Sequence, residues 1–313
     1  MCRIFASLNK GKELESVKQA VIRKPSKLKD YLIMSKANLS FLVVFSSLIG
    51  YFIVPGNHFH WMDAITLGIG GSLTTISSNI INQILERDSD KYMRRTQNRP
   101  LPQGRMGLKE AWALVFITGV LGVVIITYFF NFFAGMLGLL SLLLYGFAYT
   151  PMKKRHQIAT FIGAIPGAMP PLIGWVAATN SLMGVENYGG WALFLIQFFW
   201  QFPHFWAIAW LGYEDYDKAG IRLLPTKNGD KTKQAGMQCM YYALTLLPLS
   251  ILPNTIGLTG TTSMYIAIGL CLAYFGSALV FYLKGTNTSA KGLLYASVFY
   301  LPIVLLALLY DKI

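Results

Sequence analysis

Three oxygen-bearing side chains recur at a fixed spacing in the segment NQILERDSDKYMRRTQNRP, which covers residues 82–100. Asn82, Glu86 and Asp90 follow one another every four residues, so on a helix all three project from one face over about two turns. One amide and two carboxylates in a row form a hard oxygen surface of the kind that Mg²⁺ prefers. The spacing therefore predicts a magnesium site at the end of a helix.

A second acidic cluster, Glu214, Asp215 and Asp217, lies far along the chain; together with Glu86, Asp88 and Asp90 it holds six of the chain's 14 acidic residues. Each cluster is followed by an Arg, a Leu-Pro pair and a Gly, in NRPLPQG and in IRLLPTKNG. We expect the clusters to face each other and to hold one or two Mg²⁺ ions and a diphosphate between them. The arginines that offer bidentate donors for phosphate oxygens are Arg94, Arg95, Arg99 and Arg222.

Membrane-spanning helices must position these clusters. Hydrophobic residues make up 54% of the 313 residues, only 13% are charged, and the mean hydropathy is +0.46. This composition excludes an ordinary soluble domain and indicates a polytopic membrane protein. A helix needs about 20 apolar residues to cross the hydrocarbon layer. We expect nine such spans, at residues 38–54, 64–85, 108–130, 132–150, 158–178, 190–211, 236–254, 263–283 and 292–310.

The basic residues test this set of spans. If the N-terminus is cytoplasmic, the inner segments hold 26 of the 27 Lys and Arg residues, and only Lys312 falls outside them. A wrong number of spans would scramble this bias, so the positive-inside pattern supports nine helices with the C-terminus outside. Topology accounts for most of the net charge of +13, and no nucleic-acid partner is needed to explain it.

The predicted fold class is an all-α membrane protein with nine helices around a central cavity. We expect residues 1–37 to form a cytoplasmic N-terminal arm and residues 38–313 to form a single transmembrane domain. The two acidic clusters follow the second and sixth spans, four spans apart on the same side. A duplicated four-helix unit plus a ninth helix would produce this arrangement.

Several spans contain residues that are costly in lipid. The second span carries Thr and Ser residues and Asn79 toward its inner end, and the sixth carries Gln197, Gln201 and His204. Unsatisfied polar groups in hydrocarbon cost several kcal/mol, so we expect these side chains to face a cavity. The fifth span contains GAIPGAMPPLIGW, and its three prolines predict that it does not run as a straight cylinder.

A Mg²⁺–diphosphate site at the mouth of an apolar, aromatic cavity suits a prenyl diphosphate. The metal and the arginines would stabilise the departing diphosphate, and aromatic walls would shield an allylic cation from water. A single acid-and-arginine loop is ordinarily a solvated membrane boundary with weak ion pairs, but the repeated cluster favours the metal site. The alternative from another functional class is a transporter or haem carrier that catalyses no reaction.

The segment NQILERDSDKYMRRTQNRPLPQG resembles the first signature of the UbiA-type intramembrane prenyltransferases. Three further stretches, YTPMKKR, GAIPGAMPPLIGW and PHFWAIAWLGYEDYDKAGIRLLP, are similar to one branch of that family, the protoheme IX farnesyltransferases. The resemblance covers about residues 28–310. It implies a Mg²⁺-dependent transfer of farnesyl from farnesyl diphosphate to a vinyl group of haem B in a bacterial cytoplasmic membrane. Other haem A pathway or oxidase assembly enzymes are the implied protein partners, and another aromatic acceptor, such as a quinone precursor, is the close alternative.

The resemblance also implies site residues. The metal and diphosphate ligands are Asn82, Glu86, Asp90, Glu214 and Asp215, and the substrate-binding residues are Lys36, Arg95, Arg99, Lys153, His204 and Arg222. His204 is the best candidate for contacting the porphyrin, as an iron ligand or as a hydrogen-bond donor, although a lone His in a span is often a core residue. Lys153 and its basic neighbours could bind haem propionates, but topology alone also explains them. Gly212 and Tyr213 replace the Tyr-Lys or Tyr-Arg pair that many members carry before the second acidic motif, so the resemblance does not supply a basic phosphate contact at that point.

Overall fold

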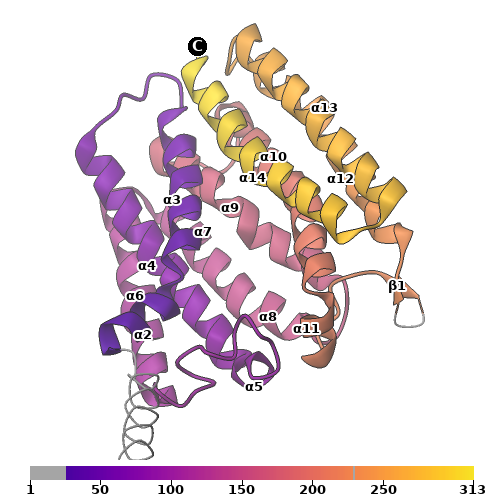
Figure 1. Ribbon diagram of the computed structural model, residues 1–313. Coiled ribbons are helices and arrows are strands. Elements are labelled where there is room, and N and C mark those ends of the chain that lie inside the picture. Colours follow the sequence, from indigo (N-terminus) through magenta and orange to yellow (C-terminus); the bar gives the residue numbers. More distant parts are fainter. Residues whose placement is uncertain (1–25, 228–229) are drawn as a thin grey trace, which may run out of the picture.

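The computed structural model describes residues 26–227 and 230–313, and Figure 1 shows a bundle of long helices. The α-helices are α2 (Lys27–Ser35), α3 (Ala37–Phe52), α4 (Trp61–Leu85), α5 (Arg87–Asp90), α6 (Leu108–Phe129), α7 (Phe132–Leu143), α8 (Thr150–Met152), α9 (Ala159–Thr179), α10 (Tyr188–Leu211), α11 (Tyr213–Lys218), α12 (Lys233–Thr255), α13 (Thr261–Lys284) and α14 (Asn287–Tyr310). A π-helix, η1 (Leu144–Tyr149), joins α7 to α8, and a 3₁₀ turn, η2 (Val185–Asn187), precedes α10. Strands β1 (Thr226–Lys227) and β2 (Asp230–Lys231) form a small antiparallel hairpin in which Thr226 pairs with Lys231.

Eight helices in the described part of the chain are long and apolar enough to cross a membrane, and a bent pair of helices raises the number to nine. The pair joins Lys27–Ser35 to Ser40–Phe52 at an angle of 47°. The prediction of an all-α membrane protein is confirmed, and its nine spans agree with the helices if the bent pair is one span. Residues 1–25 of the predicted arm lie outside the described residues.

Capping side chains and a glycine fix where some of these helices begin and end. Asn131 caps α7 by accepting a hydrogen bond from the backbone N–H of Ala134, and Thr286 forms a capping box with Ser289 at the start of α14. Gly285 ends α13 in the left-handed conformation, with φ at 58°. These caps satisfy terminal backbone groups that would otherwise be unpaired.

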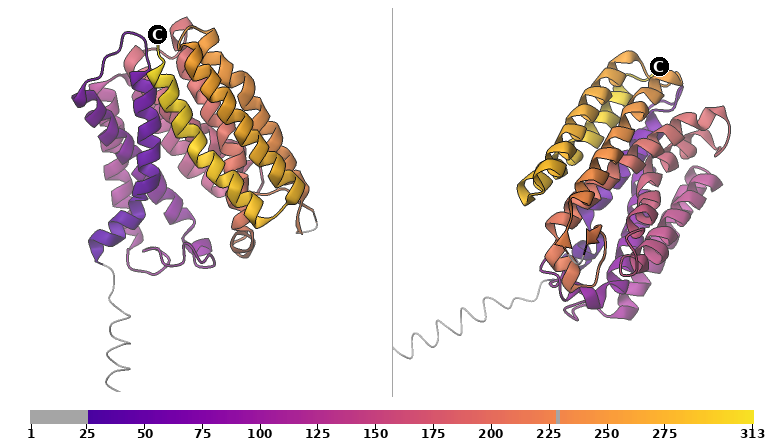
Figure 2. Two further views of the ribbon diagram at one scale, coloured as in Figure 1. Left: turned by 45° about the horizontal axis from the view of Figure 1, so that its top comes forward. Right: turned by 90° about the vertical axis from the view of Figure 1, so that its right-hand side faces the viewer.

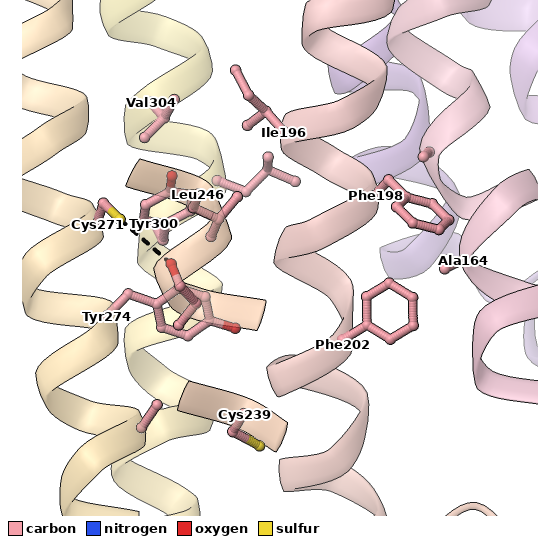
Figure 3. Packing of buried hydrophobic residues seen from close by; sticks show 14 of the residues in the cluster. Ala164, Ile196, Phe198, Phe202, Cys239, Leu246, Cys271, Tyr274, Tyr300 and Val304 are labelled. Carbon is pink, nitrogen blue, oxygen red and sulfur yellow. Dashed lines mark hydrogen bonds between the residues drawn. The ribbon is translucent and has the colours of Figure 1, made fainter. Parts of the chain in front are cut away.

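The helices form two groups with α9 and α10 between them (Figures 1 and 2). The first group consists of α3, α4, α6 and α7, and the second consists of α12, α13 and α14. Figure 3 shows the core of the second group, in which Tyr274 and Tyr300 pack among apolar side chains of α10 and α12. In Figure 1, α5 and α11 lie at the same end of the bundle, opposite the C-terminus. The two acidic clusters are therefore at one end, as the sequence predicts.

The proline-rich helix α9 runs without a break from Ala159 to Thr179. Pro170 and Pro171 have no N–H, so the carbonyls of Pro166 and Gly167 lose their helical partners. The Ser141 hydroxyl donates to the Pro166 carbonyl at 3.2 Å, and the Gln197 amide donates to the Gly167 carbonyl at 2.8 Å. Polar side chains of the neighbouring helices α7 and α10 thus stabilise the prolines within a continuous helix.

Close backbone contact holds α3 against α9. A Cβ added at Gly50 would overlap the Pro171 carbonyl oxygen, and one added at Gly174 would overlap the Ser47 carbonyl oxygen. Glycine at both positions lets the two helices approach each other at backbone distance, as small residues commonly do between membrane helices. This contact fixes one wall of the central cavity.

Candidate active site

The first acidic cluster lies where α4 passes into α5. The long helix ends at Leu85, and Glu86 caps it, but Asp90 N–H still donates to the Glu86 carbonyl at 2.8 Å, so the helical spacing continues. Asn82, Glu86 and Asp90 are 2%, 5% and 0% exposed. Asp88, between the two carboxylates, is exposed instead. The predicted common face therefore exists, and it points into the protein.

Each of these three side chains is contacted by a cationic side chain from another segment. The contacts are Lys36 Nζ to Asn82 Oδ1 at 3.0 Å, Lys153 Nζ to Glu86 Oε1 at 2.9 Å, and Arg99 Nη1 to Asp90 Oδ2 at 2.7 Å. Isolated charges are costly to bury, and these contacts compensate the two carboxylates. The structure thus brings together six residues that the sequence analysis places in the site.

Lys36 reaches Asn82 because the chain turns sharply between α2 and α3. Its φ of 47° and ψ of 53° are left-handed, a conformation that is uncommon for a residue with a Cβ. The Asn82 amide donates in turn to the Thr150 hydroxyl at 3.3 Å. Both ends of the Asn82 side chain are therefore fixed, which leaves its oxygen oriented toward the basic residue.

The two carboxyl groups are held in different electrostatic states. Burial opposes ionisation of Glu86, but the ammonium of Lys153 outweighs it and holds the pKa of Glu86 below its ordinary value. Burial raises the pKa of Asp90 above its ordinary value, in spite of the attraction of Arg99. The negative charge of Asp90 is consequently less well compensated than that of Glu86, so a bound cation would stabilise the Asp90 carboxylate more.

The donor set fits a metal ion that is shared with a substrate. Asp90 Oδ1 is buried and accepts no hydrogen bond from any described residue, so one carboxylate oxygen is free for a cation. Within residues 26–227 and 230–313, no group of three or more His, Cys, Asp or Glu side chains could hold a metal by itself. Mg²⁺ commonly uses one or two carboxylates and completes its shell with water and substrate phosphates.

Hydrogen bonds from backbone N–H groups connect the segments that surround the two acidic clusters. The backbone N–H of Arg94 donates to Asp215 Oδ2 at 3.2 Å, and the backbone N–H of Arg222 donates to the Lys153 carbonyl at 2.9 Å. Met93 also packs with Ile221 in a small apolar cluster. The loop after α5 and the loop after α11 therefore lie side by side and form one mouth, and a ligand shared between them stays a prediction.

A cavity of about 270 Å³ lies beneath this mouth. Most of its lining is apolar and comes from α3, α4, α7, α9, α10 and α14. The polar side chains among the lining residues include Thr74, Thr75, Ser78, Asn79, Gln197, Gln201 and His204. The expectation that these groups face a cavity is confirmed, whereas Ser77 instead donates to the Val115 carbonyl at 2.9 Å.

Aromatic side chains connect the cavity to the charged cluster. Tyr145 and Tyr149 line the cavity, and Lys153 Nζ lies 4.3 Å from the centre of the Tyr149 ring. Both tyrosines belong to the π-helix η1, a rare element that is frequent at functional sites. Tyr149 and Thr150 were not among the predicted site residues, although both belong to the YTPMKKR stretch and precede Lys153 by a few residues.

A model of the UbiA prenyltransferase family matches residues 43–304, which is most of the chain. The chain belongs to the UbiA prenyltransferase family. A protein of this family from Cytophaga hutchinsonii, named protoheme IX farnesyltransferase, is 43% identical over 291 residues, which is 92% of this chain and 99% of that protein.

Solved structures of UbiA-type proteins share the fold. A structure of digeranylgeranylglyceryl phosphate synthase covers 91% of this chain and 98% of its own, with a TM-score of 0.74 and 22% identity. A UbiA homolog from Archaeoglobus fulgidus, bound to GPP and Mg²⁺, covers 89% of this chain and 99% of its own, with a TM-score of 0.58 and 17% identity. At these identities the likeness establishes the architecture.

The predicted site residues of this UbiA-family protein fall into two groups. One group lies around the first cluster and the cavity: Asn82, Glu86, Asp90 and Lys153 are buried there, and Lys36, Arg99 and His204 are half-buried. The side chains of Arg95, Glu214 and Arg222 are exposed at the mouth, and Asp215 is half-buried there. No residue lies far from the mouth or the cavity, and the individual roles stay predictions.

Proposed function

We propose that this protein transfers a farnesyl group from farnesyl diphosphate to a vinyl group of haem B and so forms haem O. The observation that carries the proposal is a buried, cation-lined carboxylate cluster directly above an apolar cavity, in a chain 43% identical to a protein named protoheme IX farnesyltransferase. The cluster suits the diphosphate, and the cavity suits the hydrocarbon chain.

In the proposed reaction, the bond between C1 of the farnesyl group and the diphosphate oxygen breaks, and diphosphate leaves. C1 then forms a bond with a vinyl carbon of haem B, and water supplies the hydroxyl group on the other vinyl carbon and releases a proton. Mg²⁺, when bound, would neutralise the charge that develops on the leaving diphosphate. No other reactant is required for the balance of atoms.

The chain's own groups have distinct parts in this reaction. Asn82, Glu86, Asp90, Glu214 and Asp215 hold the metal ions, and Lys36, Arg95, Arg99 and Arg222 bind the phosphate oxygens. The tyrosines of η1 separate the charged mouth from the cavity and present ring faces to a cationic farnesyl group. The apolar cavity excludes water from that cation until the new carbon–carbon bond has formed.

We also propose the orientation that the basic residues indicate. The mouth and the N-terminus face the cytoplasm, and the C-terminus lies outside a bacterial cytoplasmic membrane. Residues 38–313 then act as one transmembrane domain made of two four-helix repeats and a ninth helix.

The test is an assay of the purified protein in lipid nanodiscs with haem B, farnesyl diphosphate and Mg²⁺. Mass spectrometry should detect haem O and one equivalent of released diphosphate, and omission of Mg²⁺ should abolish both. A parallel reaction offers an aromatic quinone precursor in place of haem B. Prenylation of that acceptor alone by folded protein would overturn the proposal and assign a different acceptor to the same mouth.

A further inference from the structure

His204 occupies a defined position in the wall of the cavity. It lies on α10 directly after Pro203, and its Nδ1 atom is 2.8 Å from the Ser297 hydroxyl on α14. The two residues are 93 positions apart in the chain, so the contact depends on the packing of α10 against α14. The sequence analysis assigns no role to Ser297.

The hydrogen bonds of Ser297 determine which nitrogen of His204 carries the proton. The Ser297 hydroxyl donates its single proton to the Leu294 carbonyl at 2.5 Å. It can therefore only accept from His204, and Nδ1 must be the protonated nitrogen of the neutral ring. Nε2 then carries the lone pair, and among the described residues the hydrogen bond of the ring is the one at Nδ1.

The plane of the imidazole ring is fixed as well. Trp200 stacks on His204 with ring centres 5.1 Å apart and an interplanar angle of 23°. The indole N–H of Trp200 donates to the Ser297 carbonyl at 2.7 Å, and the Tyr274 hydroxyl donates to the Trp200 carbonyl at 3.1 Å. Ser297 is fully buried and thus holds His204 through its hydroxyl and Trp200 through its carbonyl.

The surroundings leave room for a planar ligand at this point. Val298, next to Ser297, lines the cavity and is 45% exposed, and Leu42 of α3 lines it and is 50% exposed. The cavity therefore reaches the surface of the bundle between α3 and α14. A flat molecule bound at His204 can extend beyond the enclosed volume through this side.

We propose that Ser297 is a positioning residue that presents His204 Nε2 as an axial ligand to the iron of the haem substrate. A metal-bound His generally donates its second ring N–H to a neighbouring group, which fixes the tautomer and strengthens the ligand, and Ser297 supplies that group here. The inference rests on the proposed function, because haem B is the acceptor there, and it names the residues that hold the acceptor.

The experiment uses the full-length protein in nanodiscs with haem B alone, without farnesyl diphosphate, so that no turnover is involved. Resonance Raman spectra of the reduced complex report the iron–histidine stretching band, and a titration gives the haem affinity. The variants are His204→Ala, Ser297→Ala and Ser297→Thr. The control is Ser277→Ala, which removes a serine hydroxyl on α13 that donates only to the Ala273 carbonyl.

We expect the wild-type band to disappear in His204→Ala and to return on addition of imidazole. In Ser297→Ala the band should shift to lower frequency and haem affinity should fall about tenfold, whereas Ser297→Thr should keep both near wild type, as should Ser277→Ala. Circular dichroism of each variant confirms that the helices are formed. A wild-type band that persists in folded His204→Ala, or an unchanged band and affinity in Ser297→Ala, would overturn the inference.

The proposed function and this inference fail in different ways. If the wild type makes haem O but the reduced complex shows no iron–histidine band, haem is the acceptor and His204 does not ligate the iron. If the band is present and responds to the variants but no haem O forms, the ligand assignment stands and farnesyl transfer is excluded.

Discussion

The two acidic clusters differ in how many of their polar side chains are already buried and paired with other residues of the protein. Asn82, Glu86 and Asp90 are each at most 5% exposed, and each faces a basic partner. On α11, by contrast, Glu214 is exposed, and Asp215 accepts a hydrogen bond from the Arg94 backbone N–H. The first cluster is part of the protein core, whereas the second is held on the surface where a ligand can still reach it.

Charge explains why the two clusters are built differently. The first cluster sets two carboxylates against Lys36, Lys153 and Arg99, so its basic groups outnumber its acids and would attract an anionic diphosphate. In the proposed reaction, the acids of α11 would ligate the metal ions that the diphosphate carries. The first cluster is thus preorganised, and the second would complete the site when the ligand binds.

The largest effect should come from Asp90, whose free Oδ1 atom lies in the preorganised cluster. Asp90→Ala removes a metal ligand, so we expect kcat for haem O formation to fall on the order of 10³-fold, while haem affinity stays near wild type. Asp88→Ala is the matched control, because Asp88 is exposed and pairs with Arg87 and Lys91. Turnover that survives in Asp90→Ala while haem affinity is lost would assign Asp90 to the acceptor instead.

The next effect concerns stability. Lys153→Met leaves the Glu86 carboxylate buried without its cation, and we expect it to lower the free energy of unfolding by about 3 kcal/mol. Adding Glu86→Gln should restore much of that loss without restoring activity, because the neutral pair is stable but no longer binds metal. Thermal unfolding in detergent measures the first result, and Lys154→Met, at an exposed neighbouring lysine, is the control. Equal losses in Lys153→Met and Lys154→Met would contradict the buried-pair argument.

A substitution in the second cluster should lower activity while it leaves the stability of the protein nearly unchanged. Asp215→Asn keeps the acceptor for the Arg94 N–H but removes the charge, so we expect unfolding to change by less than about 0.5 kcal/mol. Activity should nevertheless fall by about 10–100-fold, because a metal ligand is lost. Single-turnover release of diphosphate measures the change, with Asp88→Asn, at an exposed acid that pairs with Arg87 and Lys91, as the control. If Asp215→Asn destabilised the protein as strongly as Lys153→Met, the distinction between the clusters would be wrong.

Much of the fold could be predicted because the positions of apolar and basic residues along the chain determine which segments can span a membrane. Long apolar segments and the one-sided distribution of Lys and Arg defined the spans, and the repeated four-residue spacing placed Asn82, Glu86 and Asp90 on one face. The resemblance to a known family added the acceptor and the assigned roles. These features are local in sequence or periodic, so no tertiary contact is needed to find them.

The partners of these residues could not be predicted, because they come from distant segments. Lys153 is 67 residues from Glu86, and topology alone gave a sufficient reason for a basic residue at that position. The left-handed conformation of Lys36 and the π-helix before Thr150 have no strong local signal. Ser297 was missed because a serine in an apolar helix usually satisfies its own backbone, and only the packing of α14 on α10 shows its second contact.

The smallest effect should come from a lysine that packs against aromatic rings at the start of α11. Lys231 Nζ lies 5.0 Å from the Trp210 ring and 5.4 Å from the Tyr213 ring, in a half-buried position at the base of α11. Lys231→Met removes this cation–π contact, and we expect it to cost about 0.5–1 kcal/mol of stability and to change activity less than about twofold. Chemical unfolding measures the first quantity, and Lys233→Met, an exposed lysine on the same segment, provides the reference. A loss of activity comparable to that of Asp215→Asn would mean that Lys231 orients α11 toward the ligand, and the second cluster would then be as preorganised as the first.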